Sequence, residues 1–151
     1  MKCDICGFLN NSELAIIETK YWKVNIADDQ AYLGRCYVIL KRHYGSLSDL
    51  TKEEWIDFSS LVKKLESLYK KTFGAKLLNW SCLMNDAFRQ NPANPHVHWH
   101  VRPRYDKGVE FAGMIFNDLE FGSHYVWESD RKNILSEDKL HKIVNELRKN
   151  L

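Results

Sequence analysis

The sequence predicts an α+β fold in which about five antiparallel strands form one sheet, with one long helix and one C-terminal helix packed against it. Three observations support this prediction. Short apolar runs typical of strands lie in residues 14–41 and recur near residues 80 and 100. One long helical pattern separates these groups, and a second one ends the chain. Because strands and helices are grouped rather than alternating, an antiparallel sheet is favoured over a parallel one.

The strands are predicted from runs of β-branched and aromatic residues bounded by polar turns. Thr19 and Lys20 form a tight turn between the first two runs, and Gly34 permits the bend into the third. The five predicted strands are residues 14–18, 21–26, 35–41, 76–84 and 96–104.

Two helices are predicted from capping residues and apolar spacing. Thr51 and Glu54 have the form of a capping box, so a long helix should begin there. Its apolar positions recur at spacings of three and four, which places them on one face: Trp55, Phe58, Leu61, Val62, Leu65, Leu68 and Tyr69. Ser136 caps a final helix with the apolar face Leu140, Ile143, Val144 and Leu147.

The bulk properties limit the classes of partner. The 151 residues carry 22 basic and 20 acidic side chains, a net charge of +2, which argues against a stable nucleic-acid complex. No apolar run approaches the roughly 18 residues that cross a bilayer, so no membrane partner is expected. The start of the chain does not have the pattern of a secretory signal, and we expect a cytoplasmic protein. No linker-like segment divides the chain, so residues 1–151 are predicted to form one domain.

Three histidines alternate along the last predicted strand. His96, His98 and His100 share one face of that strand, with neighbouring side chains about 6.5–7 Å apart. A neutral imidazole can act as a nucleophile while its neighbour gives or takes a proton, and Arg102 and Arg104 follow on the chain. This pattern favours phosphate chemistry. Metal chelation as the whole function is an alternative, although the run lacks the acidic residue typical of two-metal hydrolases.

Two of the four cysteines form a recognisable pair. Cys3 and Cys6 have the Cys-x-x-Cys spacing, which in a reducing compartment indicates metal binding or redox chemistry rather than a structural disulfide. A tetrahedral structural zinc site needs two further ligands, and no second Cys-x-x-Cys motif is present.

Residues 95–105, with the sequence PHVHWHVRPRY, resemble the signature of the histidine triad family. A second block, residues 34–43 followed by 46–51, resembles the strand, histidine and helix entry of the same family. Asn85 lies thirteen residues before His98, where relatives carry Asn or Gln near the phosphates.

The resemblance implies a catalytic centre on the central histidine. His98 would attack the α-phosphorus of a nucleotide and form a covalent nucleotidyl-histidine, which water hydrolyses or another acceptor captures. His100 would bind a non-bridging oxygen and help to protonate the leaving group. Asn85 would orient the phosphate, and Arg104 is a further candidate for phosphate contact. The implied substrate is a purine nucleotide, such as a dinucleoside polyphosphate or a nucleoside phosphoramidate. A nucleotidyltransferase and a zinc-stabilised nucleotide-binding or sensing protein with slow turnover are the alternatives.

The resemblance also implies a structural zinc ion, which the chemistry itself does not require. Certain relatives pair such cysteines with two histidines, which correspond here to His43 and His96, so the ligands would be Cys3, Cys6, His43 and His96. In the alternative, the two cysteines bind nothing and His43 contacts phosphate directly. Since the family is commonly dimeric, a homodimer is expected.

The nucleoside pocket is where the chain departs from the family pattern. Relatives hold the ribose with a side chain just after the second strand, and Asn25, Asp28 and Asp29 compete for that role. Pro92 and Ala93 stand where many relatives place Gln or Ser, and the polar candidates to replace them are Gln90, Asn91 and Asn94. Residues 106–151 are expected to be a C-terminal extension of the same domain.

Overall fold

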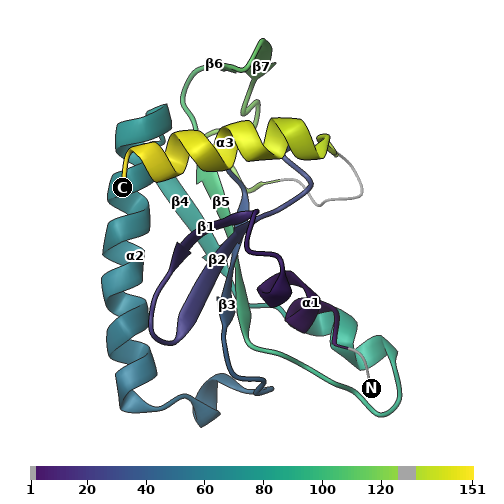
Figure 1. The fold of residues 1–151 in the computed structure, drawn as a ribbon. Coiled ribbons are helices and arrows are strands. Elements are labelled where there is room, and N and C mark those ends of the chain that lie inside the picture. Colours follow the sequence, from purple (N-terminus) through teal and green to yellow (C-terminus); the bar gives the residue numbers. More distant parts are fainter. Residues whose placement is uncertain (1–2, 126–131) are drawn as a thin grey trace.

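A single five-stranded antiparallel sheet lies at the centre of the molecule in the computed structural model, which describes residues 3–125 and 132–151 (Figure 1). The strand order is β1-β2-β3-β5-β4, and every neighbouring pair is antiparallel, as predicted. β5 therefore lies between β3 and β4, and it begins two residues later than predicted. The strands are β1 (Ala15–Glu18), β2 (Trp22–Ile26), β3 (Cys36–Leu40), β4 (Leu77–Ser81) and β5 (His98–Arg104).

The long helix α2 (Lys52–Phe73) begins at the predicted capping box. The Glu54 backbone N–H donates to the Thr51 hydroxyl at 3.3 Å, and the Thr51 N–H donates to the Glu54 carboxylate at 2.8 Å. Arg42 also binds this carboxylate, and that guanidinium lowers the pKa of Glu54. The helix start is thereby tied to the chain that leaves β3. Gly74, in the left-handed region at φ 74°, ends the helix.

The C-terminal helix α3 (Glu137–Lys149) and α2 bury their apolar stripes against the sheet. Figure 1 shows α2 running along the sheet and α3 crossing one end of it. Leu65 of α2 and Ile143 and Val144 of α3 are fully buried, which confirms the α3 face and the part of the α2 face from Leu61 onward. Trp55, predicted to belong to the α2 face, is instead 39% exposed, because it lies in the first turn of the helix, at the edge of the core. Ser136 occupies the N-cap position of α3, but its side chain makes no capping hydrogen bond.

Over the described residues, the structure adds five short elements that the sequence pattern did not predict. Helix α1 (Asp4–Asn10) precedes the sheet, and the 3₁₀ turns η1 (Leu47–Asp49) and η2 (Asn85–Arg89) lie in connections. Strands β6 (Val109–Phe111) and β7 (Met114–Phe116) form a hairpin outside the main sheet. Each element is too short for hydrophobic periodicity to distinguish it from a loop. Of the expected C-terminal extension, residues 126–131 lie outside the described part of the chain.

Gly34 sets the entry to β3. Its φ of 82° lies in the left-handed region, and a Cβ there would lie 2.3 Å from the Tyr69 ring of α2. The Tyr69 hydroxyl donates to the Gly34 carbonyl at 2.7 Å. This close approach fixes β3 against α2. β3 is also the strand that pairs with β5, which carries His98 and His100.

Within the described residues, none of the helices combines the length and the apolar character that crossing a membrane requires.

Candidate active site

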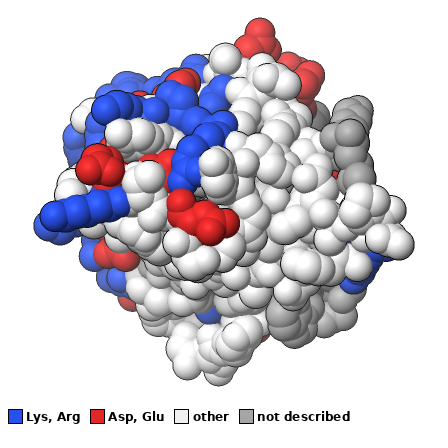
Figure 2. All heavy atoms as spheres, turned by 90° about the horizontal axis from the view of Figure 1, so that it is seen from below, with Lys and Arg blue, Asp and Glu red and all other residues white. Residues whose placement is uncertain are grey.

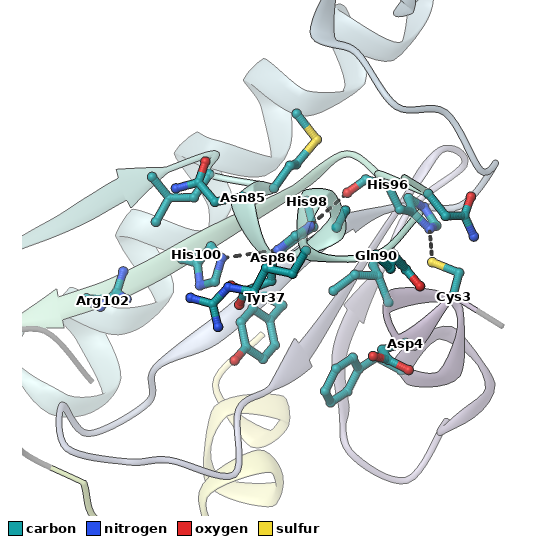
Figure 3. A pocket seen from close by; sticks show the side chains of 17 residues that line it. Cys3, Asp4, Tyr37, Asn85, Asp86, Gln90, His96, His98, His100 and Arg102 are labelled. Atoms are coloured by element: carbon teal, nitrogen blue, oxygen red, sulfur yellow. Dashed lines mark hydrogen bonds and ion pairs between the residues drawn. The ribbon is translucent and has the colours of Figure 1, made fainter. Parts of the chain in front are cut away.

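A cavity of about 490 Å³ opens beside the histidine run. Its walls come from α1, β3, the η2 turn with the segment after it, and β5 (Figure 3). Three consecutive same-face residues of β5 form its floor: His98, His100 and Arg102. The alternation along β5 explains this arrangement, because Val101, between two of them, points to the other face and is fully buried in the core.

The hydrogen bonds of His98 define its tautomer. Its Nδ1 lies 2.8 Å from the His96 carbonyl oxygen, which only accepts, so Nδ1 carries the proton. Nε2 of His98 then holds the lone pair, and it accepts from Nε2 of His100 at 3.1 Å. The atom with nucleophilic capacity therefore faces the cavity edge that His100 occupies (Figure 3).

Burial keeps both cavity histidines neutral. It is the main cause of the lowered pKa of His98, and only its bond to the His96 carbonyl and the charge of Asp86 oppose it. His100 has its pKa lowered to about 3, first by burial and then by His98 and the guanidinium groups of Arg102 and Arg35. At neutral pH both rings are therefore neutral: His98 presents the lone pair of Nε2, and His100 is a hydrogen-bond donor.

Tyr37 is a cavity residue that the sequence pattern did not single out. It pairs with His100 across the β3–β5 ladder, and its ring meets the His100 ring edge-on at 5.2 Å and the His98 ring at 6.2 Å. The ring of Phe8 from α1 lies 5.3 Å from Tyr37 on the other side. The register of β3 on β5 brings Tyr37 to the two histidines. A single sequence does not reveal the register between two strands so far apart in the chain.

The η2 turn carries polar side chains over the cavity. Asn85, the predicted phosphate-orienting residue, lines it, and so do Asp86 and Arg89, which form an ion pair at 3.2 Å. Gln90 and Asn94 also line the cavity. The turn begins at Met84, whose φ of 52° redirects the chain back over β5.

The residues expected to hold the ribose lie elsewhere. Asn25 is buried, and its Nδ2 donates to the carbonyls of Phe8 at 2.7 Å and Asn11 at 3.0 Å, so it fastens α1. Asp28 accepts from the Asp29 N–H at 2.8 Å, and neither residue is among those that line the cavity. The side chains after β2 are therefore not brought to the histidines in this structure.

Arg104 lies at the far end of β5 from the cavity. Its Nε and Nη2 atoms donate to the Asp118 carboxylate, at 2.6 and 3.0 Å. The same guanidinium group also donates to the Asn79 side chain and to two backbone carbonyls. Both members of the ion pair are almost fully buried. Arg102 rather than Arg104 lines the cavity, so the predicted phosphate contact of Arg104 has no support from its position.

Cys3, Cys6, His43 and His96 form a cluster at one end of the cavity, with one ligand atom of each residue within 4.8 Å of the others. Sγ of Cys6 lies 3.3 Å from Nδ1 of both histidines, and Sγ of Cys3 lies 3.6 Å from Nδ1 of His96. Tetrahedral zinc bonded to sulfur and imidazole nitrogen separates its ligand atoms by about 3.3–3.8 Å.

The hydrogen bonding of His96 also fits a metal ligand. Its Nε2 lies 2.7 Å from the Leu40 carbonyl, so Nε2 carries the proton and Nδ1 presents its lone pair to the sulfurs. Burial lowers the pKa of His96, which keeps this lone pair available. The donor set and its spacing therefore fit a closed structural zinc site, with no position left for substrate.

The chain is similar to known proteins in sequence and in fold. The chain is 30% identical over 87 residues to the bis(5'-nucleosyl)-tetraphosphatase of Schizosaccharomyces pombe, covering 58% of this chain and 47% of that one. It is 23% identical to the galactose-1-phosphate uridylyltransferase of Thermotoga maritima, covering 70% of this chain and 35% of that one. The chain thus spans less than half the length of these two relatives.

Two solved structures share the fold. A hypothetical histidine triad nucleotide-binding protein from Sulfolobus tokodaii superposes with a TM-score of 0.70 at 14% identity, covering 98% of this chain and 91% of that one. A zinc-bound histidine triad family protein from Mycobacterium smegmatis has a TM-score of 0.62 at 18% identity, covering 97% and 94%. The model of the HIT domain matches residues 9–107, more than half of the sequence. The chain belongs to the HIT-domain family.

Proposed function

We propose that this protein is a nucleotide hydrolase or transferase that cleaves its substrate at the α-phosphorus through a covalent nucleotidyl-His98 intermediate. The observation that carries the proposal is the state of His98: its Nδ1 proton is held by the His96 carbonyl, and its Nε2 lone pair faces a cavity edge. An imidazole in this state needs no base to become a nucleophile. The hydrolase and uridylyltransferase relatives support the same class of reaction.

In the first step, Nε2 of His98 forms a bond to the α-phosphorus while the bond from phosphorus to the leaving oxygen or nitrogen breaks. Substrate takes the place of the contact between His98 and His100, so the Nε2 N–H of His100 becomes free to donate to the phosphate. To protonate the departing group, His100 first takes up a proton at Nδ1 from solvent, so that giving up its Nε2 proton leaves a neutral ring. A nearby anionic phosphate raises the pKa of His100 from its low value, so His100 gains basicity when substrate binds. Donors placed at the developing charge stabilise the transition state.

In the second step, water or another acceptor attacks the phosphorus from the side opposite His98. The phosphorus–nitrogen bond breaks, and its electron pair returns to Nε2. The proton of the incoming nucleophile passes to His100 or to solvent. Asn85, which lines the cavity from η2, orients the phosphate oxygens throughout.

The substrate that we propose is a dinucleoside polyphosphate with a purine base. Two of the similar curated proteins are named as a bis(5'-nucleosyl)-tetraphosphatase and a bis(5'-adenosyl)-triphosphatase. A nucleoside phosphoramidate has the same reacting phosphorus and a different leaving atom. Basic side chains gather along one side of the face shown in Figure 2. The near balance of 22 basic and 20 acidic residues favours a small anionic substrate over a nucleic-acid backbone.

Cys3, Cys6, His43 and His96 would hold a structural zinc ion. When bound, the ion supplies a rigid cross-link and no catalysis, because its four ligands leave no open position. His96 then serves the chemistry only through its backbone carbonyl, which holds the proton of His98.

We also propose a homodimer in the cytoplasm. β4 is an edge strand, bonded only to β5 in the main sheet, and an edge with unpaired backbone groups is a natural pairing site. Trp55 and Ile56 of the adjacent helix α2 are exposed. Light scattering of the purified protein would measure the mass in solution, and a monomer at micromolar concentration would reject this assembly.

Turnover of a substrate panel tests the reaction. Wild-type protein would be incubated with diadenosine polyphosphates, adenosine phosphoramidate and a nucleotide sugar with phosphate, and compared with His98→Ala. The variant should lose at least about a thousandfold in kcat, because it lacks the nucleophile. His141→Ala, a half-exposed histidine of α3, is the matched control and should retain full activity. Equal rates in His98→Ala and wild type would defeat the proposal, and tight nucleotide binding without turnover would favour the sensing alternative.

A further inference from the structure

Helix α1 forms one wall of the cavity and lies close to the surface of the molecule. It has seven residues, none of them buried, and isolated helices this short are unstable. Even so, Asp4, Ile5 and Phe8 line the cavity together with His98 and His100. Figure 3 shows Asp4 on the α1 side of the cavity. The position of this wall must therefore depend on the attachments at its two ends.

The C-terminal end of α1 is fastened by the sheet. Lys23 of β2 donates from Nζ to the Leu9 carbonyl at 2.6 Å, and Asn25 donates to the Phe8 carbonyl at 2.7 Å. Both β2 side chains are buried, so these bonds are shielded from water.

The N-terminal end is fastened differently. Cys3 and Cys6 flank the first turn of α1, and their sulfurs meet His43 and His96 from other parts of the chain. A thiol–imidazole hydrogen bond is weak, whereas a metal bonded to all four groups is a rigid cross-link. The first turn of α1 is thus fixed when the cluster holds a metal.

The wall carries an aromatic contact toward the reacting histidines. The Phe8 ring lies 5.3 Å from Tyr37, and Tyr37 lies 5.2 Å from His100. A flat nucleobase beside a phosphate at His98 finds aromatic surface here, and stacking of a base on an aromatic side chain stabilises its binding. Phe8 reaches this place only while α1 keeps its position.

We propose that metal binding and nucleotide binding are coupled through α1: metal at the Cys3, Cys6, His43 and His96 cluster holds Phe8 against Tyr37, where it contacts the nucleobase. This inference rests on the proposed function, since it takes a nucleotide as the occupant of the cavity. Linkage requires that the effect be reciprocal, so nucleotide strengthens metal binding by the factor by which metal strengthens nucleotide binding.

Metal binding can also affect nucleotide binding through His96, and the experiment must distinguish this effect from the one through α1. His96 joins the cluster through its ring and holds His98 through its carbonyl, so metal loss also disturbs the phosphate end of the cavity. Phe8→Ala distinguishes the two routes, because it removes the aromatic wall and leaves all four cluster residues and the His96 carbonyl in place.

The experiment measures AMP affinity by calorimetry for zinc-loaded and zinc-free protein, and zinc affinity by competition with a chelator, with and without AMP. Wild type should bind AMP at least about fivefold more tightly with zinc, and AMP should tighten zinc binding by the same factor. Phe8→Ala should bind AMP more weakly and lose most of the coupling. Phe88→Ala, an exposed phenylalanine that does not line the cavity, should behave as wild type.

Equal AMP affinity with and without zinc would overturn the coupling and leave the proposed function intact. Failure of AMP to bind either form would instead contradict the proposed function. If zinc-free protein does not fold, zinc affinity with and without AMP still decides, because undiminished coupling in Phe8→Ala would reject α1 as the route.

Discussion

His100 should make the folded protein sensitive to mild acid. Its pKa is about 3 in the folded state, and an exposed histidine in the unfolded chain has a pKa near 6.5. Below pH 6.5 the unfolded chain binds a proton that the folded protein excludes. The free energy of unfolding therefore falls as the pH decreases, and it is fully recovered above pH 6.5.

The size of this effect follows from the pKa difference. One proton excluded over this interval costs about 1.4 kcal/mol per pH unit, so His100 should remove roughly 2 kcal/mol of stability between pH 7 and pH 5. The groups that face His100 are His98, Tyr37, Arg102 and Arg35. None of them is a carboxylate that would stabilise a protonated ring.

Urea unfolding, followed by circular dichroism at several pH values, would measure the effect. His100→Asn removes the titrating ring and keeps a polar side chain, so its stability should fall by roughly 2 kcal/mol less than that of wild type over the same interval. Titratable groups that do not contact His100 are common to both proteins and cancel in the comparison. Parallel pH profiles for the two proteins would refute the assignment of a low pKa to His100.

Three further predictions test the framework around the site. Asp118→Asn should destabilise the fold by about 3–5 kcal/mol, measured by urea unfolding, since it leaves the buried Arg104 guanidinium without its carboxylate; a loss below 1 kcal/mol would contradict the buried pair. Gly34→Ala should lower the melting temperature strongly or prevent folding, because its Cβ would meet the Tyr69 ring in a left-handed backbone conformation; an unchanged melting temperature would show that this contact relaxes. Chelation of bound metal should lower the melting temperature, with recovery on adding Zn²⁺, and a melting temperature insensitive to both treatments would exclude a structural metal.

The framework could be predicted because its signals are local. The capping box at Thr51 and Glu54 and the apolar stripe after it define α2 within a few turns of chain. Alternation along β5 likewise places His98 and His100 on one face without knowledge of any other strand. Both signals depend only on neighbours in sequence, so the structure reproduces them.

The parts of the site that were missed depend on contacts between distant residues. Strand alternation places Arg102 and Arg104 on the same face of β5, but Arg104 lies at the end of the strand away from the cavity and binds Asp118, fourteen residues later. Tyr37 reaches His100 through the register of β3 on β5. A sequence pattern within one segment identifies neither the ion-pair partner of a side chain nor the register of one strand on another.

The role of α1 was hidden for a related reason. The Cys-x-x-Cys motif indicated a metal site, but a seven-residue helix gives no periodic signal, and its use as a cavity wall depends on Asn25. Asn25 itself was expected to contact the ribose, and it instead fastens this wall. The residue type was compatible with either role, and only the fold distinguishes them.

The central claim is a covalent nucleotidyl-His98 intermediate, and the stereochemical course at the α-phosphorus tests it most directly. A substrate made chiral at that phosphorus with sulfur and oxygen isotopes would be hydrolysed, and the configuration of the product determined. Two successive in-line displacements, first by Nε2 of His98 and then by water, each invert the phosphorus, so the account predicts net retention. Net inversion would show a single direct attack by water and would contradict the nucleophilic role of His98.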